Sequence, residues 1–196
     1  MTRQLALEDI ADLRAYERQR DEVRRQVMDL KRRRRVSVGP IVTLVFENRE
    51  TVRFQVQEMA RAERLTTDEA VLDELAAYNP LIPEPGELSA TLFIELTEQE
   101  QLRQWLPRLV GIERAVELRL PGGEWARCQP EAGHAEQLTR EEVTAAVHYV
   151  RFRLTPEQVD AFAAGPVVLA VDHPAYRHET VLGEGTVAEL LSDLRP

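Results

Sequence analysis

The hydrophobic pattern changes from strand-like to helix-like in the first third of the chain. Residues 36–46, VSVGPIVTLVF, form a run of mostly β-branched and apolar side chains. This run predicts one strand buried on much of both faces, with a kink or bulge at Gly39-Pro40. Apolar residues then recur at spacings of four and three, at Val52, Val56 and Met59. The pattern therefore predicts a core strand that leads into an amphipathic helix.

A second helical pattern precedes this strand and predicts one long helix over residues 8–34. Its apolar residues alternate at three and four positions, as in a heptad seam: Leu13, Tyr16, Val23, Val27 and Leu30. Arg20 takes a position of this seam where another apolar residue is expected. The basic run 31–35, KRRRR, lies at the helix end where positive charge complements the helix dipole. A seam this narrow indicates docking onto the core of the same chain or onto a second copy, which leaves a homodimer open.

Short helices and strands alternate along the rest of the chain. Thr66, Thr97 and Thr155 each stand three residues before a Glu or Gln, which is the spacing of a capping box and predicts the start of a helix. Strand-like runs occupy residues 88–96, 115–120, 124–129, 143–154 and 166–172. The second and third of these runs flank Pro121-Gly122-Gly123 and predict a hairpin.

These elements predict an α+β fold with a mainly antiparallel or mixed sheet, short capped helices and a long N-terminal helix. We expect residues 1–35 to form the long amphipathic helix with its basic end. Residues 36–196 are expected to form a single α+β domain, because a chain of this length can bury one substantial core.

Composition indicates an ordinary globular protein, since 43% of its 196 residues are hydrophobic. The chain has no apolar run of the roughly 20 residues that span a bilayer. Its start, MTRQLALEDI, has no signal-peptide core. The single cysteine, Cys128, excludes an internal disulfide and agrees with a reducing compartment. We therefore expect a cytoplasmic protein without a membrane partner.

The charges are unevenly distributed along the chain. Residues 1–35 carry 11 Lys or Arg against 7 Asp or Glu, whereas the rest of the chain carries 14 against 27. The bulk of the molecule should therefore repel nucleic acid, and nucleic acid is not expected as a partner. The basic run 31–35 could bind nucleic acid or an acidic partner protein. The favoured interpretation is a solvated junction or an intramolecular contact with the acidic remainder of the chain.

Two sets of polar side chains are candidate ligand-binding residues. Arg49, Arg53 and Arg61 recur on one side of the helix that follows residue 48, and Arg49 lies near its N-terminus. Forked guanidinium groups near a helix N-terminus can bind carboxylate or phosphate. The alternative is a solvated face with ion pairs between residues 50 and 53 and between residues 58 and 61. Tyr149 and Arg151 share one face of a strand and could line a pocket, or could form cross-strand packing and an ion pair.

The densest group of reactive side chains is DHPAYRH, which follows the apolar strand at residues 166–172. Asp172, His173 and His178 could bind zinc or iron with a carboxylate from elsewhere, for which the candidates are Glu58, Glu84 and Glu87. A histidine here could also act as a general base oriented by Asp172, or serve only as a turn residue before proline. The chain has no phosphate-binding glycine loop, no Gly-x-Ser-x-Gly elbow and no complete catalytic motif, so it predicts no particular cofactor.

Four phrases, LKRRRRVSVGP, FENRETVRFQVQEM, PGELSATL and VDHPAY, resemble those of an uncharacterised bacterial family, a domain of unknown function that spans essentially the whole chain. Genes of that family tend to lie near rubrerythrin-like and iron–sulfur oxidoreductase genes. The resemblance therefore implies an accessory role in redox or iron metabolism, and it supplies no catalytic residue.

Two classes of function follow from these observations. The first is a non-catalytic adaptor or assembly partner of a redox or iron–sulfur enzyme, with an iron–sulfur oxidoreductase or rubrerythrin-like protein as its partner. The second is a small metal-binding protein or enzyme whose site surrounds Asp172, His173 and His178. We favour the first class.

Overall fold

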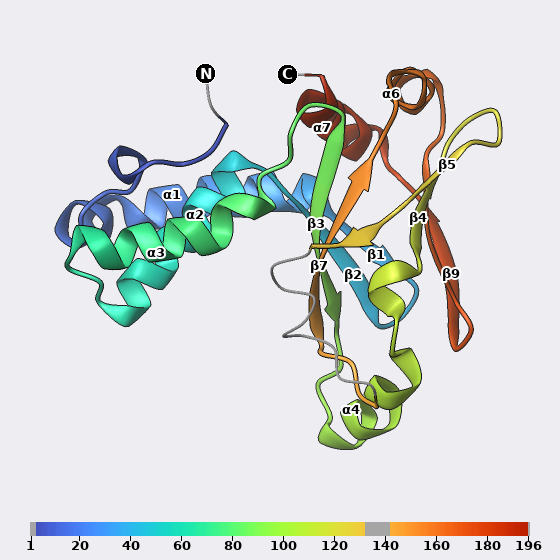
Figure 1. Cartoon of the computed structure of the whole chain (residues 1–196), viewed down its shortest axis with the longest axis horizontal. Coiled ribbons are helices and arrows are strands. Elements are labelled where there is room, and N and C mark those ends of the chain that lie inside the picture. The colour runs from blue at the N-terminus through green and yellow to red at the C-terminus, as the bar shows by residue number, and fades with distance from the viewer. Residues whose placement is uncertain (1–2, 132–141, 196) are drawn as a thin grey trace.

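The computed structural model describes residues 3–131 and 142–195. They form α-helices and two antiparallel β-sheets, which confirms the predicted α+β class (Figure 1). The sheets lie on one side of the molecule, and helices α1, α2 and α3 extend away from them at the left of the view. Within the described ranges, no helix is both long enough and apolar enough to cross a membrane.

The first sheet has five strands and the second has four. In spatial order, the first contains β1 (Arg35–Val38), β2 (Val42–Glu47), β3 (Glu87–Ile94), β7 (Val147–Arg153) and β6 (Gln129–Pro130). The second contains β5 (Trp125–Arg127), β4 (Val116–Arg119), β8 (Val168–His173) and β9 (Tyr176–Val181). Neighbouring strands are antiparallel throughout.

The helices divide into two groups. The group away from the sheets comprises α1 (Leu13–Arg34), α2 (Arg49–Glu63) and α3 (Asp68–Tyr78). The others are α4 (Gln99–Trp105), α6 (Pro156–Ala164) and α7 (Glu184–Leu194). Short 3₁₀ turns cover Leu7–Asp9, Asn79–Leu81, Leu106–Leu109 and Ile112–Arg114.

The two faces of the first sheet differ in their chemistry. On one face, Phe46, Leu92 and Phe152 are fully buried and join Leu118 and Leu169 of the second sheet in the main hydrophobic core. Successive side chains of a strand point to opposite faces, so the other face receives a second set of residues. That set includes many polar side chains: Thr43, Glu47, Ser89, Thr91, Tyr149 and Arg151. The first sheet therefore presents a polar face toward α1, α2 and α3.

The segment predicted as one strand, residues 36–46, is a β-hairpin. β1 ends at Val38, β2 begins at Val42, and Gly39 between them has a φ of 72°. Glycine adopts positive φ without the steric penalty that a side chain brings. Gly39-Pro40 therefore reverses the chain, and the prediction of a mere kink is wrong.

Helix starts are set by individual caps, and some predicted starts are wrong. The long N-terminal helix begins at Leu13 because Asp12 accepts a hydrogen bond from the backbone of Ala15. The cap of α3 is Thr67 instead of Thr66, since its side chain accepts from the amide of Ala70.

The two remaining predicted capping boxes have different outcomes. The box of Thr155 and Gln158 is confirmed, because both of its reciprocal hydrogen bonds are present at the start of α6. α4 begins after Glu98 with no side-chain cap, so the box predicted at Thr97 is wrong. The hairpin predicted around Pro121-Gly122-Gly123 is confirmed as β4 and β5.

The basic end of α1 contacts the C-terminal helix of the same chain. Arg34 is fully buried and pairs with Glu189 and Asp193 of α7, at 3.2 and 2.8 Å. Arg33 pairs with the same Glu189 at 3.0 Å. The interpretation of the run 31–35 as an intramolecular contact therefore holds for Arg33 and Arg34.

Candidate functional site

The three arginines predicted as an anion site are each engaged in an ion pair. Arg49 pairs with Asp9 at 2.6 Å. Arg53 pairs with Glu50 at 2.7 Å, as the solvated alternative predicts. Arg61 pairs with Glu17 of α1 at 2.8 Å and not with a residue of its own helix. Arg49 and Arg61 therefore connect α2 to neighbouring segments, Arg53 pairs within α2, and the three do not converge on a common ligand position.

Arg20, the polar residue in the hydrophobic seam of α1, joins the two helices. Its guanidinium donates two hydrogen bonds of 2.8 Å to the carboxylate of Glu58 on α2, which also accepts from the Tyr16 hydroxyl at 2.7 Å. The hydrogen bonds from Arg20 hold the pKa of Glu58 down, to about 2. Glu58 therefore has a structural role in the helix pair.

The side chains proposed as metal ligands lie on one hairpin, β8–β9, but do not converge. Asp172 points to the opposite face from His173 and pairs with Arg177 at 3.1 Å. His173 is buried, and its two ring nitrogens contact the carbonyl of Val110 and the amide of Ala175. His178 packs its ring against Tyr176, with centroids 4.5 Å apart.

Two of the three additional carboxylates proposed for this metal site, Glu58 and Glu87, are engaged elsewhere. Glu87 pairs with Arg151 and Arg153 on β7, and the backbone amide of Glu84 donates to Glu87. Among residues 3–131 and 142–195, no group of three or more His, Cys, Asp and Glu side chains is arranged to hold a metal ion.

Tyr149 and Arg151 have separate surroundings although they share one face of β7. Arg151 donates to Glu87 and to the carbonyl of Pro80, as the ion-pair interpretation predicts. Tyr149 lines a cleft between this face of the sheet and the three helices, as the pocket interpretation predicts.

This cleft has a volume of about 370 Å³, within the range of small-molecule sites. Residues of the sheet form its floor: Val45, Glu47, Thr91, Phe93, Val147 and Tyr149. Residues from α1, α2, the end of α3 and the following 3₁₀ turn form its other walls: Met28, Lys31, Val52, Gln55, Tyr78 and Leu81. Arg35, at the start of β1, completes the lining. The cleft combines apolar and aromatic walls with a few polar groups.

Glu47 is the buried charged side chain of the cleft floor. Only 9% of its surface is exposed, and its Oε1 accepts a 2.6 Å hydrogen bond from the Thr91 hydroxyl. Burial raises the pKa of Tyr149, with smaller contributions from nearby Tyr78 and Glu47. A carboxyl group and two phenols therefore lie close together in this cleft. Sequence reasoning missed Glu47 as a site residue, because a glutamate at the end of a strand is usual at a turn.

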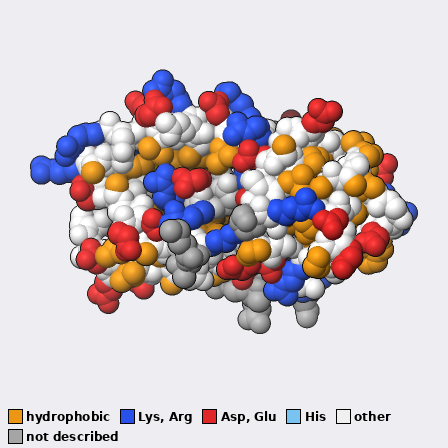
Figure 2. Space-filling model, turned by 90° about the horizontal axis from the view of Figure 1, so that it is seen from above, with side chains coloured by type: hydrophobic (Ala, Val, Ile, Leu, Met, Phe, Trp, Pro, Cys, Tyr) orange, Lys and Arg blue, Asp and Glu red, His pale blue; other side chains and the backbone are white. Residues whose placement is uncertain are grey.

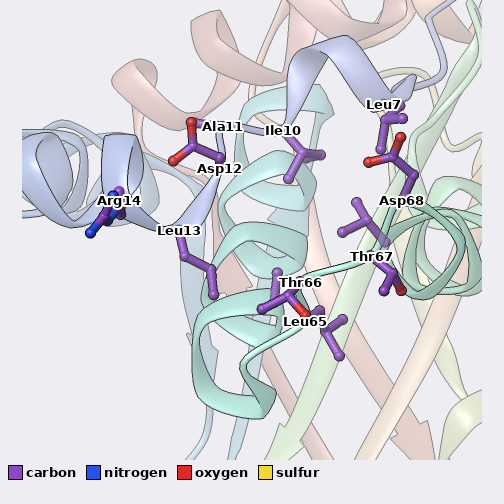
Figure 3. Close-up of a pocket in the computed structure, with 12 residues that line it drawn as sticks. Leu7, Ile10, Ala11, Asp12, Leu13, Arg14, Leu65, Thr66, Thr67 and Asp68 are labelled. Atoms are coloured by element: carbon purple, nitrogen blue, oxygen red, sulfur yellow. The ribbon is translucent and has the colours of Figure 1, made fainter.

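A second hollow, of about 270 Å³, lies at the far end of the helices (Figure 3). Its walls combine apolar side chains, with Leu7, Ile10 and Leu65 among those labelled, and the polar side chains of Asp12, Arg14, Thr66, Thr67 and Asp68. Its polar residues Asp12 and Thr67 already cap α1 and α3. Two of the five polar residues of the lining thus already serve as helix caps.

The outer side of α1 carries a continuous row of exposed residues. We call this row the outer stripe; it comprises Arg14, Arg18, Asp21, Arg25, Met28 and Arg32. Their spacing of four and three residues places them on one face of the helix. Figure 2 shows Lys and Arg side chains over the helices in the left half of the view, interspersed with acidic ones.

Cys128 is expected to be unreactive in the folded protein. Burial raises the pKa of its thiol to about 12, and the Sγ atom contacts the carbonyl oxygen of Glu113 at 3.2 Å. Almost no thiolate therefore exists at neutral pH. Iodoacetamide labelling followed by mass spectrometry should modify Cys128 only after urea unfolding. Rapid modification of the folded protein would contradict this environment.

Comparison with known proteins places the chain in a family without assigned chemistry. A family model described as "Protein of unknown function (DUF3501)" matches residues 4–194. A crystal structure of a novel protein of unknown function from Burkholderia pseudomallei K96243 is similar, with 34% identity and a TM-score of 0.89. The match covers 97% of this chain and 99% of that one. No curated protein matches. The resemblance to an uncharacterised family is thus confirmed, and the chain belongs to the DUF3501 family of proteins of unknown function.

Proposed function

We propose that this protein is a non-catalytic accessory protein that docks onto an acidic surface of a partner protein through the outer stripe of α1. The stripe itself is the observation that supports the proposal, because it presents four arginines and an exposed methionine on one helix face. Arginine and methionine are enriched at protein interfaces relative to the rest of a protein surface.

The fold does not need the outer stripe for its own stability. The opposite side of α1 buries Tyr16 and Val27, and Arg34 anchors the end of the helix on α7. Arg14 and Arg18 form no ion pair with any residue of the described ranges, whereas most arginines elsewhere do. Arg25 and Arg32 pair with Glu22 and Asp29 of their own helix, so the positive charge that the stripe keeps available to a partner lies at Arg14 and Arg18.

The family resemblance supplies the class of partner in this proposal. Family genes that neighbour those of rubrerythrin-like and iron–sulfur oxidoreductase proteins suggest an accessory role in a redox or iron–sulfur enzyme system. Complementary charge would orient such a partner on α1 and speed its association.

A three-arginine variant tests the proposal. Arg14→Gln, Arg18→Gln and Arg25→Gln, combined in one protein, should weaken binding to the purified iron–sulfur oxidoreductase or rubrerythrin-like protein by about tenfold or more at low ionic strength. Isothermal titration calorimetry at low and physiological salt would measure both the affinity and its salt dependence.

The matched control removes the same charge far from α1. Arg103, Arg114 and Arg177 are exposed arginines of other elements, and their combined replacement by glutamine should leave the affinity unchanged. If both variants weakened binding equally, the loss of affinity would come from net charge and not from the position of the arginines on α1. Undiminished binding by the α1 variant would refute docking through the outer stripe.

A further inference from the structure

We propose that the cleft between the first sheet and helices α1 to α3 binds a small organic amine with an apolar body and a carboxylate at its far end. The amine would meet Glu47 on the floor, and the carboxylate would lie toward Lys31 of α1. This inference concerns a surface that shares only Met28 with the outer stripe, and it does not depend on the docking proposal.

Glu47 supports the position of the amine. Its side chain is 9% exposed, lines the cleft and accepts one hydrogen bond from Thr91. No Lys, Arg or His of the described residues forms an ion pair with it. The neighbouring Arg34 donates to the backbone carbonyls of Phe46 and Glu47 and not to the Glu47 carboxylate. It forms an ion pair with Asp193 of α7. A buried carboxylate without a cationic partner is costly, and a bound ammonium group would offset that cost.

The polar face of the sheet has a composition that packing alone does not require. Thr91 lies directly opposite Val45 on β2 and opposite Tyr149 on β7. A face that only had to pack against helices would normally carry apolar side chains, as the other face of this sheet does. Here the helices leave a cleft over Thr91, Glu47 and Tyr149, so these groups converge on one space.

The walls suit the body and the charge of an amine. Phe93, Tyr78 and Tyr149 place aromatic rings in the lining. Aromatic faces attract ammonium groups, and the attraction increases where water is excluded. Val45, Val52 and Leu81 supply aliphatic surface for an apolar body.

The basic residues of the lining determine the other end of the ligand. Arg35 is held by Glu95, which leaves Lys31 as the cation of the lining without a carboxylate partner in the described ranges. The Lys31 ammonium lies 5.9 Å from the centroid of the Phe54 ring. A simple amine would meet repulsion from Lys31, whereas a ligand with a terminal carboxylate would gain an ion pair there.

The test uses 4-(aminomethyl)benzoate, whose amine and carboxylate lie at opposite ends of an aromatic ring. Titration of the full-length protein, followed by two-dimensional NMR of its valine methyl groups, should shift the resonances of Val45 and Val147 saturably. The probe 4-methylbenzoate lacks the amine and should bind at least about tenfold more weakly, as the loss of a charge-assisted hydrogen bond predicts.

Single substitutions test whether Glu47 binds the amine of the probe and Lys31 its carboxylate. Glu47→Gln should weaken 4-(aminomethyl)benzoate about tenfold and leave 4-methylbenzoate unaffected, and Lys31→Met should weaken both probes. Glu98→Gln removes an exposed carboxylate outside the cleft and should change neither affinity.

Two results would overturn the inference. One is the absence of saturable shifts at Val45 and Val147 with 4-(aminomethyl)benzoate. The other is equal affinity for the two probes in the wild-type protein, a comparison that holds even if Glu47→Gln fails to fold.

Discussion

Replacing Arg34 with methionine will lower the free energy of unfolding by about 3–5 kcal/mol, as the loss of one partner from a buried ion pair predicts. Arg34 has no exposed surface, and its guanidinium contacts Asp193 at 2.8 Å and Glu189 at 3.2 Å. The replacement leaves the buried carboxylate of Asp193 without its cation. Urea denaturation at neutral pH would measure the change.

The neighbouring Arg33 gives a matched control for this prediction. It pairs with the same Glu189, but its side chain is 52% exposed. Arg33→Met should therefore change the stability by no more than about 1 kcal/mol. Equal losses in both variants would show that net charge, and not the buried pair, accounts for the effect.

The destabilisation by Arg34→Met should decrease as the pH falls. Burial raises the pKa of Asp193 above its ordinary value, and Arg34 opposes this rise. Without Arg34 the pKa will rise further, so the folded variant takes up a proton at Asp193 at a higher pH than the wild type does. Since the folded variant gains this proton as the pH is lowered, the stability difference between variant and wild type narrows toward acid pH. A difference that stays constant down to about pH 4 would contradict this account.

Arg34 also shows which part of the fold the sequence could not supply. Arg34 continues the seam of α1, four residues after Leu30, whereas Arg32 and Arg33 lie off the seam. The spacing can therefore mark Arg34 as the inward-facing arginine of the run. It cannot identify the partner, because Glu189 of α7 lies 155 residues further along the chain.

Helix α7 itself was missed although its pattern is present in the sequence. Val187, Leu190, Leu191 and Leu194 recur at spacings of three, one and three, which is one face of a helix. All four belong to the main core or pack against it. By contrast, the box of Thr155 and Gln158 was predictable because its two hydrogen bonds connect residues only three positions apart.

The candidate site was only partly predictable for a similar reason. Tyr149 could be assigned to a pocket because alternation within one strand places it beside Arg151. The cleft also needs Glu47 from β2, Thr91 from β3 and Tyr78 from α3. The register of the sheet brings Glu47, Thr91 and Tyr149 together, and the packing of α3 adds Tyr78; one sequence specifies neither.

Replacing Gly39 with alanine will destabilise the protein by about 3 kcal/mol, through strain at positive φ and overpacking. Gly39 has a φ of 72°, and an added Cβ atom would overlap the ring of His178 and the hydroxyl of Tyr176. That hydroxyl is already fixed, since it donates to the carbonyl of Val38 at 2.6 Å and accepts from the amide of Ile41 at 3.2 Å. The β1–β2 turn therefore cannot move to make room for the Cβ atom without breaking its hydrogen bonds to Tyr176 of β9.

Gly122→Ala separates the two causes of this loss. Gly122 has a φ of 89°, and nothing lies within 4 Å of an added Cβ atom, so its replacement measures strain alone, at about 1 kcal/mol. Thermal unfolding of both variants gives the overlap contribution as their difference. If Gly39→Ala costs no more than Gly122→Ala, the turn is not held against Tyr176 and His178. A larger loss at Gly39 means that the hairpin turn is shaped by residues more than 130 positions away, which is why sequence pattern predicted only a kink there.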